Sequence, residues 1–322
     1  MLTVVLIVLL SFLASAIFQP AKAQQSYRIG MLVSGSVSTH GRRIDAFRQG
    51  LRELGYVEGK NIVIEYKYAE GKRERFADRA AEMVRLKPDV IFVGSTGFAA
   101  AAKKATSTIP IVAVGGDLVG AGLVASLARP GGNVTGSTNI SPDLSGKRLE
   151  LLKEAVTKVA RVAVLWGSSR DDEDEIKQTE IAARRLGVTI DPVPVRAPNE
   201  IVEAFAALTQ KNANALVIIQ GTFTNSHIKQ LAELAAKNRL PSIGEPPDYA
   251  NNGGLMSYGS NNDDLWRRSA IFVDKILKGR TPSDLPVEQP IKFDFVINLK
   301  TAKQIALTIP FRVLERADRV IR

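Results

Sequence analysis

The chain has 322 residues, of which 45% are hydrophobic and 24% are charged, so it is long enough for about two ordinary globular domains and its composition excludes a disordered chain. It contains no cysteine, which excludes disulfides, thiol nucleophiles and cysteine-based metal sites. The formal net charge is +10, but the lysines and arginines stand beside acids, as in KRERFADRAAEMVRLK (72–87), and this favours solvated helix faces over a nucleic-acid-binding surface.

The first 23 residues are interpreted as an export signal. Leu2–Phe18 is an apolar run that Pro20 breaks, and residues 21–23 give the small-x-small pattern that a signal peptidase accepts. A membrane anchor is the alternative, since no lysine or arginine precedes the run, but the run is short for a spanning helix of about 20 residues. No cysteine for lipid attachment follows. We therefore expect cleavage near Ala23 and a soluble mature protein in the periplasm.

The first half of the mature chain alternates strands and helices. Apolar β-branched runs separated by segments with apolar residues at helical spacing predict a βαβαβαβ order, which implies a parallel sheet covered on both faces. The expected strands span 27–34, 61–68, 89–95 and 109–115, and the expected helices span 45–54, 75–86 and 98–105.

The second half repeats this plan. GGNVTGST (131–138) is echoed by GGLMSYGS (253–260), and a helix that ends in Leu-Gly before a strand occurs in both halves. An internal duplication of one α/β lobe explains these echoes. The expected strands span 161–167, 188–195, 215–221 and 241–245, and the expected helices span 174–186, 199–208, with Asn199 as the N-cap, and 227–237.

Four expected strands end in glycine and hydroxyl residues, two in each half. In an open parallel sheet, ligands bind at the carboxyl ends of the strands, where helix N-termini offer N–H groups. Caps and turns are the alternative explanation for any single ending, but the matched positions favour a cleft between two lobes. The endings are VSGSVST (33–39), VGSTG (93–97), WGSS (166–169) and QGTFTNS (220–226).

Sequence motifs of catalysis are missing. There is no G-x-x-x-x-G-K-[ST] phosphate loop, no G-x-G-x-x-G dinucleotide motif and no G-x-S-x-G nucleophile elbow. His40 and His227 each stand beside an expected helix start and are interpreted as surface residues. The acidic run DDEDE (171–175) is interpreted as helix-start acids favoured by the macrodipole, because it lacks the spacing of a calcium loop. We expect no metal and no cofactor.

Several longer stretches resemble the substrate-binding components of ABC importers, in the branch related to tryptophan- and tyrosine-type binders. The resemblance covers essentially the whole mature chain and implies a non-catalytic protein, a monomer, that delivers a small solute to an ABC permease and its ATPase. The stretches are RPGGNVTG (129–136), SGKRLELLKE (145–154), RVAVLW (161–166), GGLMSYG (253–259) and VEQPIKFDFVINLKTAKQIALTIP (287–310).

The resemblance also implies a type I periplasmic-binding-protein fold, in which two doubly wound α/β lobes are joined by a three-crossover hinge. The crossovers would fall near Ser141, Asn261 and Val287. Lobe 1 would comprise 27–140 plus 262–285, and lobe 2 would comprise 142–260 plus 287–322. A receptor for a signalling partner and a two-lobed α/β transferase are the alternatives. A transcription repressor would need an N-terminal helix-turn-helix, where the apolar run stands instead.

Helix N-termini that face one cleft favour a carboxylate. In the aromatic-amino-acid branch the loop that corresponds to 220–226 supplies an acid near an asparagine, whereas here Asn225 has none beside it, so Asp117 and Glu245 are the candidates to hold an amine. An aromatic wall would complete a site for a small carboxylate with an apolar or aromatic body, with a neutral sugar as the runner-up, although a core position is the alternative for Trp166. The candidate ligand contacts are Ser34, Gly35, Ser95, Thr96, Asp117, Thr138, Asn139, Trp166, Gln220, Thr222, Phe223, Glu245 and Tyr258.

Overall fold

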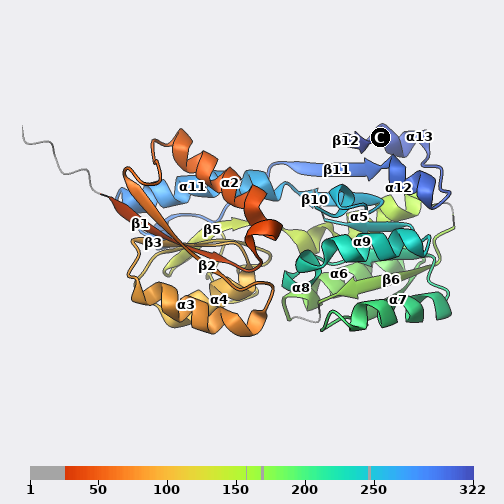
Figure 1. Ribbon diagram of the computed structural model, residues 1–322, viewed down its shortest axis with the longest axis horizontal. Coiled ribbons are helices and arrows are strands. Elements are labelled where there is room, and N and C mark those ends of the chain that lie inside the picture. Colours follow the sequence, from red (N-terminus) through yellow and green to blue (C-terminus); the bar gives the residue numbers. More distant parts are fainter. Residues whose placement is uncertain (1–25, 157, 168–169, 246–247) are drawn as a thin grey trace, which may run out of the picture.

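The computed structural model describes residues 26–156, 158–167, 170–245 and 248–322 (Figure 1). The expected signal peptide, 1–23, lies outside the described residues. Among the helices that are described, none is both long enough and apolar enough to cross a membrane.

Two α/β lobes lie side by side along the long axis of the molecule (Figure 1). The sheet of the first lobe is parallel throughout, with the order β2-β1-β3-β4-β5. Its strands are β1 (Tyr27–Val33), β2 (Ile62–Tyr68), β3 (Val90–Val93), β4 (Ile111–Gly115) and β5 (Val134–Thr138). The helices that cover it are α2 (Val37–Glu53) and α11 (Asn262–Leu277) on one face and α3 (Phe76–Arg85) and α4 (Thr96–Ala105) on the other.

The sheet of the second lobe has the order β12-β11-β10-β9-β8-β6-β7 and is parallel except between β10 and β11. Its strands are β6 (Arg161–Trp166), β7 (Thr189–Pro194), β8 (Ala215–Ile218), β9 (Ser242–Gly244), β10 (Met256–Ser260), β11 (Phe293–Asn298) and β12 (Arg319–Ile321). The longer helices are α5 (Ser141–Ala155), α6 (Arg170–Leu186), α7 (Glu200–Gln210) and α9 (Ile228–Lys237), and the shorter ones are α8 (Thr222–Ser226), α10 (Asp248–Asn251), α12 (Leu299–Gln304) and α13 (Phe311–Leu314).

The α/β architecture expected from the sequence is confirmed, and residue chemistry explains the strand positions. The central strands β3 and β8 read VIFV and ALVI and are buried throughout, as expected for parallel strands with helices on both faces. Strand β7 reads TIDPVP and lies at the edge of its sheet, because proline cannot donate to a ladder and is confined to edges and bulges.

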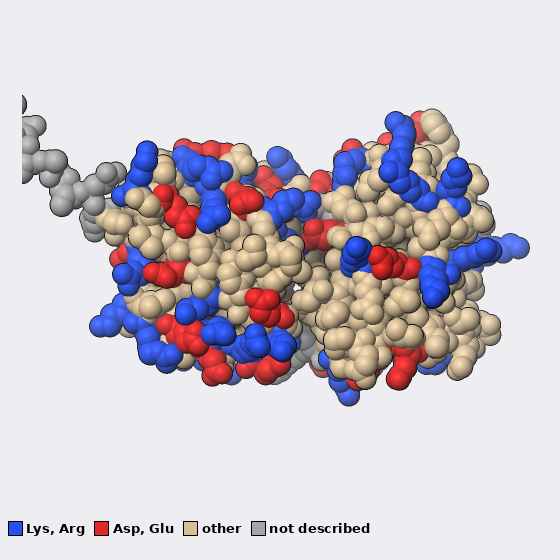
Figure 2. All heavy atoms as spheres, in the orientation of Figure 1, with Lys and Arg blue, Asp and Glu red and all other residues tan. Residues whose placement is uncertain are grey.

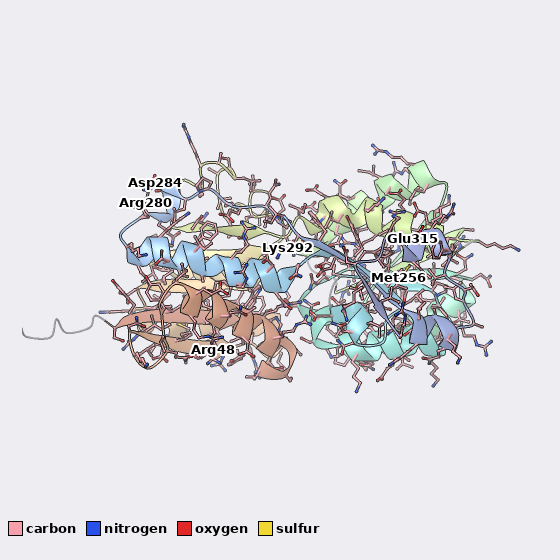
Figure 3. All side chains as sticks on the ribbon, turned by 90° about the horizontal axis from the view of Figure 1, so that it is seen from above. Arg48, Met256, Arg280, Asp284, Lys292 and Glu315 are labelled. Atoms are coloured by element: carbon pink, nitrogen blue, oxygen red, sulfur yellow. The ribbon has the colours of Figure 1, made fainter. Side chains whose placement is uncertain are left out.

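The chain passes between the sheets three times: after β5, after β10, and again before β11. In the third passage, backbone bonds tie Glu288 to β5, with Thr138 N donating to Glu288 O at 2.9 Å and Glu288 N donating to Gly136 O at 2.9 Å. Lys292 lies between the lobes on this passage (Figure 3). Over the face shown in Figure 2, basic and acidic side chains are interspersed on both lobes.

Several helix starts differ from the expectation, and side-chain contacts explain those of α2 and α7. Helix α2 begins at Val37 instead of Asp45, because Ser36 and Thr39 form a capping box in which Ser36 N donates to Thr39 Oγ1 at 2.9 Å. Asn199 is not a side-chain cap: its backbone is already helical, and it makes no capping bond. The turn before α7 is held instead by the Glu200 carboxylate, which accepts from Arg196 N at 2.7 Å.

Helices α2 and α11 lie side by side although they are far apart in the sequence (Figure 3). Gly50 permits their close approach, since a Cβ added there would lie 2.0 Å from the Arg267 carbonyl oxygen. Gly50→Ala is therefore expected to lower the free energy of unfolding by about 1–3 kcal/mol, because the overpacked helices must separate.

Gly41 is the matched control on the same helix, because a Cβ there would meet nothing within 4 Å. Gly41→Ala is expected to stabilise the helix by up to about 1 kcal/mol. Urea denaturation of both variants checks the pair, and equal stabilities would contradict the assigned role of Gly50.

Candidate ligand-binding site

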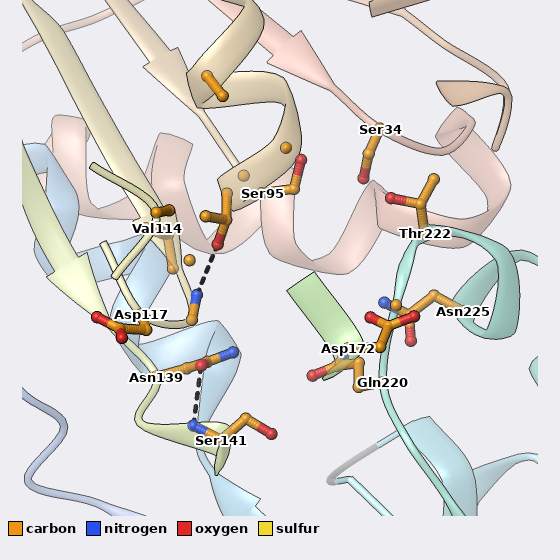
Figure 4. A pocket seen from close by; sticks show the side chains of 18 of the residues that line it. Ser34, Ser95, Val114, Asp117, Asn139, Ser141, Asp172, Gln220, Thr222 and Asn225 are labelled. Atoms are coloured by element: carbon orange, nitrogen blue, oxygen red, sulfur yellow. Dashed lines mark hydrogen bonds between the residues drawn. The ribbon is translucent and has the colours of Figure 1, made fainter. Parts of the chain in front are cut away.

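A cavity of about 510 Å³ lies between the two lobes, at the carboxyl ends of strands from both sheets. Its volume falls within the range of about 300–1,000 Å³ that is typical of small-molecule sites. Figure 4 shows polar side chains from both lobes around this space. The cavity therefore has the place and size of a binding site for one small solute.

Three of the four expected strand endings contribute to its lining. Ser34 follows β1, the Ser95–Thr96 pair follows β3, and Gln220 and Thr222 follow β8. The fourth ending, 166–169, gives no lining residue among those described, and Ser168 and Ser169 lie outside the described residues. Helix α6, which follows this ending, takes its place in the wall.

Seven of the thirteen candidate contacts line the cavity, and six do not. Those in the lining are Ser34, Ser95, Thr96, Asp117, Asn139, Gln220 and Thr222. Those outside it are Gly35, Thr138, Trp166, Phe223, Glu245 and Tyr258.

The polar residues outside the lining are engaged elsewhere. A Cβ on Gly35 would lie 2.3 Å from Thr39 Oγ1, so this glycine is packed under the first turn of α2. The Thr138 hydroxyl donates to the Gly116 carbonyl. Glu245 is ion-paired with Arg148, 3.0 Å away at Nη1, so here it does not offer its charge to the cavity.

The aromatic wall expected from Trp166, Phe223 and Tyr258 does not line this cavity. Trp166 packs on the second-lobe core, Phe223 stacks on His227 with ring centroids 4.4 Å apart, and Tyr258 meets Phe295 edge-on. A different aromatic residue, Trp266 of α11, reaches the lining from the first lobe. The resemblance placed residues 262–285, which include Trp266, in lobe 1, but the sequence gave no sign that this side chain reaches the cavity.

The first-lobe wall contains the N-terminus of α4. Ser95 is its N-cap, with extended backbone and a side chain that accepts from Phe98 N at 3.4 Å. Thr96 Oγ1 accepts from Gly116 N at 2.9 Å, which ties the start of α4 to the loop after β4 (Figure 4). The first N–H groups of a helix have no partner within it, so this end attracts an anion.

The second-lobe wall is acidic. Asp172, in the first turn of α6, is buried and lies beside the 220–226 loop: a Cβ added at Gly221 would be 3.0 Å from Asp172 Oδ1. Figure 4 places Asp172 near Asn225 and Thr222. An acid therefore lies beside this loop, and it comes from α6 and not from the loop itself. The acidic run lies at the start of α6, as expected, but Asp172 and Glu175 are both buried.

A buried ion cluster, formed by Ser141, Arg148, Glu175 and Glu245, adjoins this wall. Arg148 is fully buried; its Nη2 lies 2.6 Å from Glu175 Oε1, and its Nη1 lies 3.0 Å from Glu245 Oε1. Burial raises the pKa of Glu175 to about 7, against the opposing effect of Arg148, and Glu245 and Asp172 add to the rise. The sequence did not reveal this cluster, because Arg148 reads as a surface residue in SGKRLELLKE.

His40 is buried instead of exposed, which corrects the expectation from the sequence. It lines the first-lobe wall, with Nδ1 2.9 Å from Thr39 Oγ1 and Nε2 3.4 Å from Ser34 Oγ. Burial, assisted by the charge of Arg43 and opposed by that of Asp248, lowers the pKa of His40 to about 3. His40 is therefore neutral at every physiological pH.

This lowered pKa predicts an acid-sensitive stability. Between about pH 6.5 and pH 3 the unfolded histidine binds a proton that the folded one does not, so stability falls as the pH falls. His40→Gln is expected to reduce the loss of unfolding free energy between pH 8 and pH 5 by about 2 kcal/mol. Urea denaturation at both pH values checks this, and an unchanged loss in the variant would contradict it.

Ion pairs connect the lobes beside the cavity. Arg42 of α2 lies 2.9 Å from Asp248 Oδ1 of α10, and Arg43 pairs with the other oxygen of the same carboxylate. Arg42 also pairs with Asp263 of α11, at 2.9 Å. The two pairs with Asp248 connect the lobes in the arrangement seen here, whereas the Arg42–Asp263 pair lies within the first lobe.

Residues 30–321 match a family model that is described as ABC transporter substrate binding protein. The chain belongs to this family. It is therefore a non-enzymatic solute-binding protein of an ABC transporter.

Its relatives include binders of aromatic amino acids. A tyrosine-binding protein of Clostridioides difficile (strain R20291) is 27% identical over 288 residues, which cover 88% of this chain and 82% of the relative. The structure of an ABC domain from Streptococcus pneumonia in complex with L-Trp is 26% identical with a TM-score of 0.86, covering 92% of this chain and 100% of that one. A ligand-free, open substrate binding protein from Clostridium difficile is also 26% identical, but its TM-score is 0.67, with 92% and 99% covered.

More distant structures show the fold alone. A periplasmic binding protein/LacI transcriptional regulator from Alkaliphilus metalliredigens is 11% identical with a TM-score of 0.57, covering 84% of this chain and 97% of that one. The substrate-binding protein described here thus has a two-lobed fold like that of type I periplasmic binding proteins, as the sequence resemblance implied.

Proposed function

We propose that this protein is exported, with cleavage near Ala23, and captures an α-amino acid with an apolar or aromatic side chain between its lobes for delivery to an ABC importer. The observation that carries this proposal is the opposite charge preference of the two cavity walls. An amino acid zwitterion has one charged group for each wall. N-terminal sequencing of the secreted protein tests the export step, and an uncleaved, membrane-retained chain would contradict it.

The first-lobe wall favours the carboxylate. It combines the N-terminus of α4 with two basic residues of the lining, Arg73 and Lys104. Asp117 is an acid on this wall, but its Oδ1 accepts from the backbone N–H groups of Val119 at 3.0 Å and Gly120 at 2.8 Å. Its charge is thus partly compensated within its own turn, and the wall as a whole attracts an anion.

The second-lobe wall favours the ammonium group. Asp172, Asp174 and Glu175 all belong to the lining, and the described basic lining residues all belong to the first lobe. Asp172 is the best placed, because it is buried beside the Gly221 loop and close to Asn225, which can add an amide oxygen. A carboxylate and an amide oxygen together suit a group that carries three N–H donors.

The side chain of the solute would meet a mostly small apolar surface. Trp266 is held firmly at this surface. Its ring packs edge-on against that of Phe92, with ring centroids 4.8 Å apart, and Gly94 leaves room for it because it has no side chain. The other apolar members of the lining are Val114, Ala100, Ala121 and Pro142. The relatives named for tyrosine and bound to L-Trp support an aromatic amino acid as the first candidate.

Closure of the lobes would bring the two walls onto one ligand and exclude water from it. At equal sequence identity, the chain superposes better on the L-Trp complex than on the ligand-free, open relative, with TM-scores of 0.86 and 0.67. This favours a closed-like arrangement here, to which the pairs of Arg42 and Arg43 with Asp248 contribute.

A thermal-shift screen of the mature protein, unfolded and refolded to remove bound solute, tests the proposal. An amino acid with an apolar or aromatic side chain is expected to raise the melting temperature, because a ligand at a thousand times its Kd stabilises the native state by about 4 kcal/mol. Organic acids without an amine and neutral sugars serve as controls. A shift with a sugar and none with any amino acid would overturn the proposal.

A further inference from the structure

The Ser141–Arg148–Glu175–Glu245 cluster buries two carboxyl groups with one guanidinium. The side chain of Arg148 is 0% exposed, and those of Glu175 and Glu245 are each 5% exposed. If both carboxyl groups were ionised, one negative charge would remain uncompensated inside the protein, which is strongly unfavourable. Charge balance therefore calls for one proton on the carboxyl pair.

The Ser141 hydroxyl leads to the same conclusion. Its Oγ lies 2.8 Å from Glu175 Oε2 and also contacts Glu245 Oε1, and Arg148 Nη2 donates to it from 3.1 Å. A serine hydroxyl has one hydrogen and can donate it to one of the two carboxyl groups. The carboxyl group that does not receive this hydrogen also has an oxygen in contact with Ser141 Oγ. This second contact is favourable when that carboxyl group carries a proton and donates it to Ser141 Oγ. The raised pKa of Glu175 agrees with the presence of one proton on the carboxyl pair.

The cluster is within reach of the solute. Ser141 and Glu175 belong to the cavity lining, and Asp172 lies one turn before Glu175 on α6. The charged groups that act on Glu175 are Arg148 from α5, Glu245 from the end of β9 and Asp172 from α6 itself. From β10, the Tyr258 carbonyl accepts from Arg148 Nη1 at 3.4 Å. An ammonium group beside Asp172 would add a positive charge next to the pair and favour its fully ionised form.

We propose that this cluster holds one exchangeable proton in the unliganded protein and releases it to solvent when the ammonium group of an amino acid binds beside Asp172. The inference rests on the proposed function. The proton leaves a glutamic acid carboxyl group, and the ammonium group replaces its positive charge, so the net charge at the second-lobe wall is conserved while the carboxylate of the solute binds at the first-lobe wall. Capture of the solute is thereby linked to pH, and a solute without a positive group does not expel the proton.

Calorimetry with L-tyrosine as the probe tests this linkage. Titrations in phosphate and in imidazole, which both buffer near neutral pH and differ in their heats of ionisation, give the number of protons released. The expected release is about one proton at pH 6 and about half a proton at pH 7, and binding is expected to be about tenfold weaker at pH 6 than at pH 8.

Glu175→Gln, which mimics the protonated carboxyl group, is expected to abolish the proton release and to remove the pH dependence of Kd. Glu173→Gln, at an exposed position on the same helix, is expected to behave like the wild type.

The outcomes separate the inference from the proposed function. Binding of L-tyrosine without any buffer dependence would overturn the inference and leave the proposed function intact, as would a Glu175→Gln variant that still releases the proton. Infrared spectroscopy of the unliganded protein, labelled with ¹³C-glutamate, measures the proton independently of any ligand. A protonated carboxyl band is expected at pH 6 that fades toward pH 8 and is missing in Glu175→Gln; absence of such a band in the wild type would overturn the inference even if no amino acid binds.

Discussion

Arg148→Met is expected to lower the free energy of unfolding by about 3–5 kcal/mol, because removal of one member of a buried ion cluster leaves an uncompensated charge inside the protein. Arg148 donates to Glu175, to Glu245 and to the Ser141 carbonyl, at 2.6, 3.0 and 2.7 Å. Without the guanidinium, two carboxyl groups would remain buried with no cation. A loss of this size is a large fraction of the stability of an ordinary domain.

Urea denaturation measures this loss, and Lys147→Met is the matched control. Lys147 precedes Arg148 in the sequence but is partly exposed, and it pairs with Glu150 one turn later on α5. Removing this surface pair is expected to change the stability by less than about 1 kcal/mol. Adding Glu175→Gln and Glu245→Gln to Arg148→Met is expected to recover part of the loss. Equal stability of the two single variants would contradict the structural role of the cluster.

Asp172→Asn is expected to weaken the binding of L-tyrosine by about 2–5 kcal/mol, which is about thirtyfold or more in Kd, because the ammonium group would lose its charged partner in a closed site. The side chain keeps its size, so the fold is expected to persist. Glu173→Gln is the control, since Glu173 is the next residue on α6 and is exposed. Calorimetry on both variants, after circular dichroism has confirmed folding, gives the two affinities. Unchanged affinity in Asp172→Asn would remove this residue from the proposed ammonium site.

The layered fold could be predicted from the sequence because its signals are local. Apolar runs such as VIFV in β3 and ALVI in β8 identify central strands without any knowledge of their neighbours. The place of the Gly-Ser and Gly-Thr endings at the cavity could be predicted once the strands were assigned, because the carboxyl ends of parallel strands meet at one edge of the sheet. Ser95 and Thr222 accordingly lie in the same cavity.

The second-lobe wall could not be predicted, because it depends on contacts between distant parts of the chain. Arg148 stands in a charged helical stretch and is buried by Glu175 and Glu245, which are 27 and 97 residues away. Asp172 stands among other acids, and only its approach to the Gly221 loop distinguishes it from the exposed Glu173. The helical periodicity of the sequence does not distinguish Arg148 and Asp172 from the exposed charged residues beside them.

Aromatic residues were misplaced for a related reason. Trp166 ends a strand, and strand ends were expected to face the cleft, yet its ring packs on the second-lobe core. Trp266 lies in a helix that follows the second sheet and returns to the first lobe, so its place in the cavity depends on a chain crossover. His40 shows the same limit: a capping box extends α2 toward the N-terminus and carries His40 into the wall.

Calorimetry with three related compounds tests the central claim most directly: L-tyrosine, its deaminated acid 3-(4-hydroxyphenyl)propanoate, and its decarboxylated amine tyramine. If the cavity recognises a zwitterion through oppositely charged walls, L-tyrosine binds tightly and each analogue binds about 10- to 100-fold more weakly, because each lacks one charge-assisted set of hydrogen bonds worth about 1.5–3 kcal/mol. Equal affinity for the deaminated acid, or tight binding of a neutral sugar with no response to any amino acid, would contradict the account.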